Sequence, residues 1–292
     1  MKVVNIIGGL GNQMFIYATY IALKKLHPFE SIKVCTNSFI GYPLHNGYEI
    51  DRIFKTEDLH ANFSDLINVA YPFFNYRTWQ IMTHLLPRRS TMVKCTEHTP
   101  FNYEDLKKTQ DCFYDGYWQN EGYFIDARNE VMKAFKFPPF TSQKNIELSK
   151  KIQNSISVAC HIRRGDYLKD KRWNVCTVAY YMQAIKMIQE YVNPNLFCIF
   201  SNDINWCKEA LGDSFNGIET LYVDWNKKEN SFRDMQLMSL CKHNIVANSS
   251  FSWWGAWLNQ NLNKIVISPN QWMVEPWQNS PVPNSWIKIK IN

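Results

Sequence analysis

The stretch that decides the fold is SVACHIRRGDY, residues 157–167. It begins with small and β-branched residues typical of a buried strand, and it continues into two arginines, a glycine and an aspartate. A strand that carries two guanidinium groups to its carboxyl end is unfavourable unless an anion meets them there. The stretch therefore predicts a buried strand that presents Arg163 and Arg164 to an anionic ligand.

Four further strand-like runs follow this one and alternate with helix-like segments. The runs are LFCIFSN (196–202), ETLYVD (219–224), HNIVAN (243–248) and KIVISP (264–269), and the helix-like segments between them are 177–192, 204–211, 231–242 and 251–261. Strands that alternate with helices predict an α/β unit with a parallel sheet and right-handed crossovers. Ligands of such sheets bind beyond the carboxyl ends of the strands.

Three loops lie at this ligand-binding edge of the predicted sheet. They are HIRRGDY (161–167), SND (201–203) and NSSFSWW (248–254). Asn248, Ser249 and Ser250 precede a predicted helix, and a helix N-terminus favours anions. Taken singly, each feature has an ordinary structural reading, because paired arginines often include one structural residue and a serine before a helix is usually a cap. Their conjunction favours a clamp for a phosphate or pyrophosphate.

The chain opens with a second strand, turn and helix pattern. Residues 3–7 predict a strand, GGLGNQ (8–13) a turn, and residues 14–26 a helix. Met14 stands where the last glycine of GxGxxG belongs and no P-loop lysine follows Gly11, so the usual nucleotide-binding loops are disfavoured. The glycines still let a backbone approach a ligand, and Asn12 and Gln13 can bind a sugar or phosphate oxygen. The alternative is a tight turn with no ligand.

The middle of the chain is harder to interpret. We expect a strand in 31–37, a helical stretch over 66–86 that breaks at Pro72, and a strand leading into a loop in 111–124. The Pro-Pro pair at 138–139 and the helix that follows place the domain boundary within 137–155. The predicted domains are residues 1–150 and 151–292.

Composition excludes several classes of protein. The 292 residues carry a net charge of +6 with no Lys/Arg block, which disfavours a dedicated nucleic-acid binder and suits an anionic small molecule or a peripheral contact with an anionic surface. Eight cysteines form no zinc or CxxC spacing, which indicates a reducing compartment. The sequence shows no signal peptide or membrane span. We therefore expect a cytoplasmic protein, with peripheral contact to the inner face of a membrane compatible with these data.

The carboxylates give no sign of a metal site. The chain has no Asp-x-Asp, and its carboxylates do not cluster with histidine. If the ligand is a nucleotide-sugar diphosphate, arginine and a helix dipole must neutralise the leaving pyrophosphate in the metal's place. We therefore expect neither a metal nor another cofactor.

Three segments together resemble a known family. GGLGNQMFIYA (8–18), HIRRGDY (161–167) and NSSFSWWGAWL (248–258) are similar to the signature segments of the bacterial-type alpha-1,2-fucosyltransferases of glycosyltransferase family 11. GYWQNEGYF (116–124) and residues 233–248 also resemble family segments, so the resemblance covers nearly the whole chain. It implies a GT-B-like enzyme, with a cleft between an acceptor-side N-terminal domain and a GDP-fucose-binding C-terminal domain, both Rossmann-like.

The resemblance also implies roles for particular residues. Arg163 is expected to contact the β-phosphate of GDP-L-fucose and to stabilise charge on the departing GDP. The remaining residues expected at the donor are His161 and Asp234 at the guanine end, Ser249 or Ser250 at the pyrophosphate, Asn12 near the β-phosphate and the reacting sugar, and Arg164, Asn248, Gly9 and Gly11 around them. The implied reaction is metal-independent and inverts the anomeric centre as fucose passes to the 2-hydroxyl of a terminal β-galactose.

The general base and the acceptor contacts are less defined. Asp166 can take the acceptor proton, or it can pair with an arginine and orient it. Tyr117, Trp118 and Gln119 are candidate acceptor contacts, because aromatic faces pack on sugars, and core packing is the alternative for them.

Two positions depart from the family pattern. Asn202 and Ala179 stand where related sequences often carry an acidic residue, and we expect neither to touch the pyrophosphate clamp. The membrane anchor and stem of animal Golgi relatives are not seen, which favours a bacterial enzyme that builds a surface glycan.

The competing interpretations are a fucosyltransferase of alpha-1,6 or protein O-linked specificity and a non-catalytic glycan-binding protein. The acceptor and the oligomeric state are not readable from the sequence.

Overall fold

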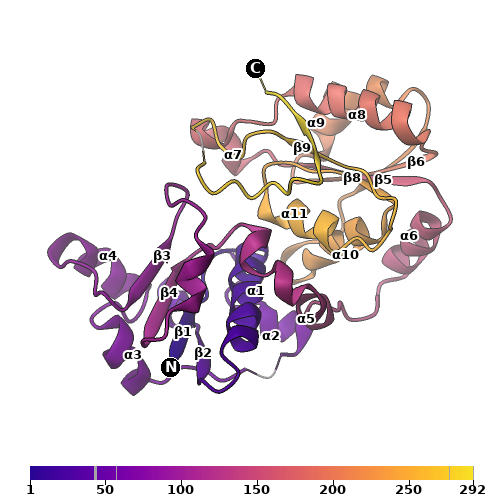
Figure 1. The fold of residues 1–292 in the computed structure, drawn as a ribbon. Helices are drawn as coiled ribbons and strands as arrows, with labels where there is room; N and C mark the ends of the chain where they lie inside the picture. The colour runs from indigo at the N-terminus through magenta and orange to yellow at the C-terminus, as the bar shows by residue number, and fades with distance from the viewer. Residues whose placement is uncertain (43–44, 57, 276, 292) are drawn as a thin grey trace. The chain divides into compact units, whose positions relative to one another are not determined.

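The computed structural model describes residues 1–42, 45–56, 58–275 and 277–291, apart from the side chain of Asp166. Two compact units make up the chain, Met1–Pro138 and Pro139–Asn292 (Figure 1). Each unit contains a parallel sheet with helices, which confirms the predicted α/β fold class. No helix among the described residues is both long enough and apolar enough to cross a membrane.

The N-terminal unit is built on a four-stranded sheet with the strand order β2-β1-β4-β3, in which every pairing is parallel. Its elements are β1 (Lys2–Asn5), α1 (Leu10–Leu26), β2 (Ile32–Cys35), η1 (Asn37–Phe39), α2 (Ile50–Phe54), α3 (Phe63–Ala70), α4 (Tyr76–Leu85), β3 (Met92–Cys95), η2 (Tyr103–Lys107), β4 (Cys112–Gly116), η3 (Glu121–Tyr123), η4 (Ile125–Ala127) and α5 (Arg128–Ala134). The strands predicted within 31–37 and 111–124 and the helix break near Pro72 are confirmed, whereas β3 and α2 were not predicted.

Helix α1 starts earlier than predicted. Gly9 is its N-cap in an extended conformation, and Leu10 is the first helical residue. Both Asn12 and Gln13 therefore lie within the first turn of the helix and not in the turn before it. Twelve of the seventeen residues of α1 are buried, so the helix is part of the core of this unit.

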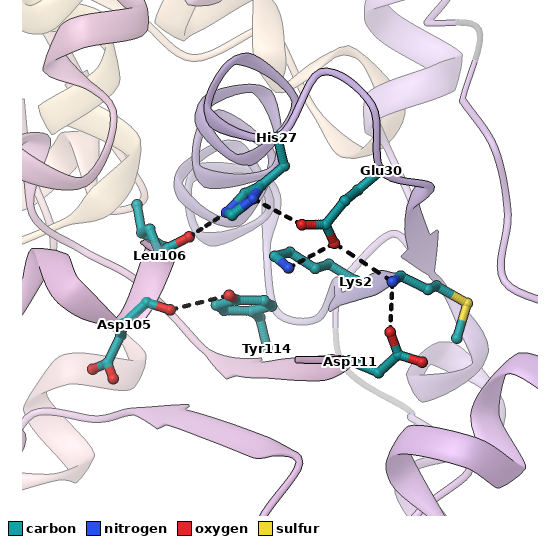
Figure 2. A network of polar contacts seen from close by, with 8 residues as sticks. Lys2, His27, Glu30, Asp105, Leu106, Asp111 and Tyr114 are labelled. Carbon is teal, nitrogen blue, oxygen red and sulfur yellow. Dashed lines mark hydrogen bonds and ion pairs between the residues drawn. The ribbon is translucent and has the colours of Figure 1, made fainter. Parts of the chain in front are cut away.

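A polar network ties the amino-terminal end of this sheet to α1 (Figure 2). Lys2 is fully buried, and its Nζ donates to Glu30 Oε2 at 2.8 Å. His27 Nδ1 lies 2.9 Å from Glu30 Oε1, and its Nε2 lies 2.7 Å from the carbonyl oxygen of Leu106. Burial alone would raise the pKa of Glu30, but the hydrogen bond and charge of Lys2 outweigh it and lower that pKa. The network fixes the end of the sheet that lies opposite the strand carboxyl ends.

The C-terminal unit is built on a six-stranded sheet with the strand order β10-β9-β8-β5-β6-β7, again wholly parallel. Its elements are α6 (Gln143–Gln153), β5 (Ser157–Ile162), α7 (Asp166–Lys169), η5 (Lys171–Trp173), α8 (Val178–Val192), β6 (Leu196–Ser201), α9 (Ile204–Leu211), η6 (Gly212–Phe215), β7 (Glu219–Val223), η7 (Lys228–Asn230), α10 (Phe232–Leu240), β8 (His243–Ile245), α11 (Ser250–Trp257), β9 (Val266–Pro269) and β10 (Ile287–Ile289). All five strands predicted in this half are confirmed, and β10 is the one strand of this sheet that was not predicted.

Helices cover both faces of this sheet at strand β5. Val158, Cys160 and Ile162 belong to the core that includes residues of α8 and α9, whereas Ala159 belongs to the core formed with α6 and α10 (Figure 1). This period of two explains why every residue of β5 is buried. From β5 the chain continues to β6 and β7 on one side and then returns to β8, β9 and β10 on the other. The switch point of the sheet therefore lies between β5 and β8, where ligands of such sheets bind.

The boundary between the units lies before α6. The structure divides the chain between Pro138 and Pro139, within the predicted boundary region 137–155, whereas the nominal division at residue 150 would assign most of α6 to the N-terminal domain. Leu148 and Ile152 of α6 pack in the same core as Ala159 of β5. This packing makes α6 part of the C-terminal unit.

Candidate functional site at the carboxyl end of strand β5

Gly165 shapes the turn that follows β5. Its φ of +60° lies in the region that favours glycine, and a Cβ atom there would approach Asn202 Nδ2 to 2.6 Å. Asn202 Oδ1 accepts a hydrogen bond from the backbone N–H of Arg164 at 2.9 Å. Asn202 was expected not to touch the pyrophosphate clamp, but its amide oxygen bonds the backbone of Arg164, a residue of that clamp, and so holds the arginine turn against the loop after β6.

Arg164 is held from two sides by the neighbouring loop and helix. Its Nε lies 3.1 Å from Asp203 Oδ2, and its guanidinium carbon lies 3.8 Å from the centroid of the Trp206 ring. Asp203 is also the N-cap of α9, because its Oδ1 accepts from the N–H of Trp206 at 3.3 Å. One carboxylate thus orders both the helix and the arginine.

Arg163 lies on a pocket of about 270 Å³ in this unit. The pocket is lined by Arg163, Arg164, Tyr167, Leu168, Trp173, Asn174, Cys176, Thr177, Val178, Trp206 and Asn248. The Arg163 guanidinium carbon lies 5.3 Å from the centroid of the Tyr167 ring, and that ring lies 5.6 Å from the ring of Trp173. Two arginines with aromatic walls can bind an anionic group attached to a sugar.

His161 is a buried neutral imidazole next to this charge. Its residue exposure is 7%, and its buried Nδ1 has no hydrogen-bond partner among the described residues. Burial, reinforced by the charge of Arg163, lowers the pKa of His161 to about 3. The ring lies 5.9 Å from the ring of Phe251 in α11. His161 can therefore offer a neutral donor or acceptor but no positive charge near pH 7.

Asn248 ties together the loops around the pocket. Its Nδ2 donates to the carbonyl oxygens of Trp173 at 3.0 Å and Trp272 at 2.9 Å, and Tyr167 donates its hydroxyl to the Asn248 carbonyl at 3.3 Å. Both hydrogens of this amide are thus engaged within the protein. Asn248 lines the pocket, but its side-chain amide shapes the pocket wall.

Ser249 and Ser250 begin α11 as predicted from the sequence. Ser249 is the N-cap in an extended conformation, its side chain makes no capping bond, and its residue exposure is 6%. Neither serine lines the pocket that Arg163 and Asn248 line. Their expected role at a pyrophosphate stays a prediction.

The tryptophans of α11 pack and orient the helix. Trp253, Trp254 and Trp257 are buried, and Trp253 Nε1 donates to the carbonyl oxygen of Pro281 at 2.7 Å. A Cβ atom on Gly255 would approach Met238 Cβ of α10 to 2.8 Å, so glycine permits the close contact of the two helices. The buried tryptophans and Gly255 therefore hold α11, and with it the N-terminus of the helix, in place against α10.

Asp234 lies in the first turn of α10 and within an amide network. Asn226 Nδ2 donates to Asp234 Oδ1 at 2.8 Å, and Asn145 Nδ2 donates to Asn226 Oδ1 at 2.9 Å. Burial raises the pKa of Asp234 to about 7, and it outweighs the opposing hydrogen bond from Asn226 and the charge of Lys227. Asp234 does not line the arginine pocket. It can gain or lose a proton near neutral pH.

In the N-terminal unit, the turn from β1 into α1 is held together by internal hydrogen bonds. Gln13 is fully buried, donates to the carbonyl oxygens of Gly8 and Gly47 at 2.8 Å each, and accepts from the N–H of Glu49 at 2.8 Å. Asn12 Oδ1 accepts from Gln119 Nε2 at 2.6 Å. Gln13 is therefore structural.

The glycines of this turn lie close to neighbouring side chains. A Cβ atom on Gly9 would approach His45 Nδ1 to 3.2 Å, and Gly11 is buried within α1. The donor-binding roles expected for Gly9, Gly11 and Asn12 stay predictions.

The three candidate acceptor residues follow β4. Trp118 has 1% exposure and packs between the rings of Tyr114 and Tyr123, at centroid distances of 5.6 and 5.0 Å, so its ring face is in the core. Gln119 is also buried, and its Oε1 has no hydrogen-bond partner among the described residues. Tyr117 is half-buried, and burial raises its pKa to about 12. Of the three, only Tyr117 retains substantial exposed surface.

The sequence of this chain matches a single family along nearly its whole length. The match is to Glycosyl transferase family 11 over residues 1–290. The chain belongs to glycosyltransferase family 11. Alpha-1,2-colitosyltransferase of Escherichia coli is 33% identical, with 99% of this chain and 98% of that protein covered.

Other relatives of this family 11 chain extend to mammals. The O-antigen biosynthesis glycosyltransferase WbnK of Escherichia coli is 28% identical over 97% of this chain and 98% of its own length. Galactoside alpha-(1,2)-fucosyltransferase 2 of Hylobates lar is 24% identical over 88% and 69%. Among solved structures, NodZ alpha-1,6-fucosyltransferase soaked with GDP-fucose aligns with a TM-score of 0.51 at 11% identity, over 88% of this chain and 91% of that one. This last likeness supports the fold alone.

Several residues of this family 11 site were not predicted from the sequence. Trp206 and Trp173 are pocket walls, and Asp203 is the partner of Arg164. Asp203 could have been predicted, because it lies in the SND loop at the end of a predicted strand. No sequence motif marks either tryptophan as a pocket residue. The side chain of Asp166 lies outside the described residues, so its expected role as base stays a prediction. Within the described ranges, no group of three or more His, Cys, Asp or Glu could hold a metal ion.

Proposed function

We propose that this family 11 protein transfers L-fucose from GDP-L-fucose to the 2-hydroxyl of a terminal β-galactose, with inversion and without a metal ion. The observation that carries this proposal is the arrangement at the end of β5. Arg163 lies on a pocket at the switch point of a parallel sheet, while Asp203 and Trp206 hold the adjacent Arg164. This arrangement suits a doubly charged leaving group.

The donor's pyrophosphate would lie against Arg163. Arg163 can form paired hydrogen bonds to a phosphate, and the positive end of α11 adds to the local potential. Arg164 adds a second positive charge whose position is already set by its partners. At the guanine end of the donor, the neutral imidazole of His161 would add a hydrogen-bonding group without another cation.

The reaction itself would proceed in one displacement. The oxygen of the acceptor's 2-hydroxyl attacks the anomeric carbon of fucose from the face opposite GDP, and a new C–O bond forms there. The bond from that carbon to the β-phosphate oxygen breaks, and its electron pair leaves with GDP. Negative charge on this oxygen grows in the transition state, so Arg163 contributes more there than in the bound donor.

The proton of the acceptor hydroxyl needs a base. Asp166 directly follows the arginine turn, and we assign it this role, with the orientation of an arginine as its alternative. The two roles differ in donor binding, because an orienting carboxylate holds an arginine that binds GDP, whereas a base acts only on the acceptor proton. A large loss of kcat in Asp166→Asn with unchanged GDP affinity supports the base, and a matching loss of GDP affinity supports the orienting role.

The comparisons also favour a second donor. The relative at 33% identity is an alpha-1,2-colitosyltransferase, and colitose is the analogue of fucose that lacks the 3-hydroxyl. Both sugars would leave the same GDP, so the arginine pocket does not distinguish them. Discrimination would come from a polar group that meets the 3-hydroxyl, because a site built for a hydroxyl rejects its deoxy analogue strongly.

The decisive experiment incubates purified protein with GDP-fucose or GDP-colitose and a panel of β-galactosides in excess EDTA. GDP release is followed, and NMR assigns the linkage and anomeric configuration of the product. An α-1,2 linkage formed despite EDTA supports the proposal, and the faster donor identifies the sugar. Another linkage would assign a different regiochemistry. Sugar binding with neither GDP binding nor product would favour the glycan-binding protein instead.

A further inference from the structure

The segment from α3 to the end of α4 exposes many large apolar side chains. Seven of the twenty exposed large apolar residues of the described chain lie within residues 63–86. They are Phe63 (63% exposed), Ile67 (43%), Tyr71 (55%), Trp79 (37%), Ile81 (58%), Leu85 (68%) and Leu86 (46%). We call these seven residues the α3–α4 surface. Such a concentration of exposed apolar side chains marks an interaction site.

Helix α4 presents the most exposed part of this surface. All ten of its residues are described, and none is buried. One side packs on the chain through Tyr76, whose ring lies 5.2 Å from that of Tyr42. Arg77, Ile81 and Leu85 are spaced four residues apart, so they share one face, and all three are exposed. In Figure 1 this helix lies on the outside of the N-terminal unit.

The stretch of chain that follows Asp65, including all of α4, carries formal charge of one sign. Between Asp65 and Glu97 the sequence contains four cationic residues and no carboxylate. Arg88 is paired with Asp115 at 3.1 Å, whereas Arg77, Arg89 and Lys94 are exposed. Arg89 Nη1 donates to the carbonyl oxygen of Ile67 at 2.8 Å, which holds this cation at the exposed end of α3. A partner for this surface should therefore be both apolar and anionic.

We propose that the α3–α4 surface docks this protein on an anionic lipid bilayer. Ile81 and Leu85 enter the boundary between headgroups and acyl chains, while Arg77 and Arg89 remain at the level of the lipid phosphates. A helix whose exposed face combines apolar residues with arginine, in an acid-free stretch, matches such a surface better than it matches a neutral protein partner. This inference is independent of the proposed donor and acceptor.

The test is co-sedimentation of the full chain with vesicles of phosphatidylethanolamine and phosphatidylglycerol, compared with phosphatidylcholine alone. Binding should require phosphatidylglycerol. Arg77→Glu should weaken it by about thirtyfold, because each unit of charge near an anionic surface contributes a factor of about five. Ile81→Ser with Leu85→Ser should abolish it. Leu262→Ser, a control at a residue with 99% exposure in the other unit, should bind like wild type.

Three results would overturn the proposal. They are no binding to either vesicle, equal binding to both vesicles, and undiminished binding by the Ile81/Leu85 variant. Analytical ultracentrifugation without lipid tests a second copy as the occupant. Self-association that the Ile81/Leu85 variant abolishes would assign this surface to a dimer instead. Far-ultraviolet circular dichroism verifies that each variant is folded.

Discussion

Two turns of this protein occupy the same place in similar sheets, yet they use their polar residues differently. Residues 8–13 follow β1 in the N-terminal unit, and residues 163–167 follow β5 in the C-terminal unit. In the first turn, Gln13 is fully buried, and its side-chain amide forms hydrogen bonds with the backbone of Gly8, Gly47 and Glu49. In the second, Arg163 and Arg164 line a pocket.

The difference shows that a polar residue at a strand end is not by itself a sign of a ligand. A buried amide can form hydrogen bonds with the backbone of its own turn, as Gln13 does. Its donors and acceptor are then already used and do not bind a ligand. Guanidinium groups cannot be satisfied by backbone N–H groups, so they need a carboxylate, a carbonyl or a bound anion. Asp203 meets this need for Arg164. We assign the pyrophosphate to Arg163 because it lies on the pocket at the end of β5, beside the ring of Tyr167.

The largest expected effect tests this assignment. Arg163→Ala should lower kcat/KM for GDP-fucose by about a hundredfold to a thousandfold, the usual result of removing one donor to a developing oxyanion. Steady-state kinetics with a saturating β-galactoside measures it. Arg163→Lys, which keeps the charge without the paired donors, should give an intermediate loss. A decrease in kcat/KM of less than about fivefold in Arg163→Ala would contradict the assignment of the pyrophosphate to Arg163.

The first turn is tested by stability. Gln13→Ala removes the partner of three backbone groups near the start of α1, which should lower the free energy of unfolding by about 1–3 kcal/mol. Urea denaturation measures this change. Gln80→Ala on exposed α4 is the matched control and should change stability by less than about 0.5 kcal/mol. An unchanged stability of Gln13→Ala, together with a raised KM for the donor, would make this turn a ligand site like the other.

Arg164 should show a smaller kinetic effect than Arg163. Arg164→Ala should lower kcat/KM by about tenfold, because it adds charge to the pocket and packs its wall. Asp203→Ala should have a similar effect, and the double variant should be no worse than either single variant because the two side chains act as one unit. Additive losses, or a loss with Arg164→Ala as large as that with Arg163→Ala, would contradict the distinction between the arginines.

The smallest effect concerns pH. Burial raises the pKa of Asp234 to about 7, and only the carboxylate form can accept hydrogen bonds at both of its oxygens from two N–H groups of guanine. GDP affinity should therefore increase a few-fold from pH 6 to pH 8, and this pH dependence should disappear in Asp234→Asn. Calorimetric titration at several pH values measures it. A flat wild-type profile would remove Asp234 from the guanine end.

The same carboxyl also affects the unliganded protein. Because its pKa in the folded state is raised above the unfolded value, its contribution to stability is fully present below about pH 4 and is lost as pH rises through about 7. Asp234→Asn should therefore melt higher than wild type at pH 8 and equally at pH 4.

The sequence predicted the parts of this fold that depend on local pattern. The five predicted strands of the C-terminal unit are short runs between helix-like segments, and the arginine and serine segments follow two of them. The remaining features of the fold and the site depend on tertiary packing. Leu148 and Ile152 place α6 in the C-terminal unit because they pack in the same core as Ala159 of β5, which no local pattern reveals. Strand β10 has three residues, and Trp206 becomes a pocket wall only because α9 lies beside the arginine turn.

The measurement that tests the central claim most directly compares GDP with GMP as ligands of wild type and Arg163→Ala, by calorimetric titration in EDTA. The two nucleotides differ by the β-phosphate, so the ratio of their Kd values isolates the contact assigned to Arg163. We expect wild type to prefer GDP strongly and Arg163→Ala to bind the two nucleotides almost equally. A preference for GDP that persists undiminished in Arg163→Ala would contradict the account, because the β-phosphate would then be bound elsewhere.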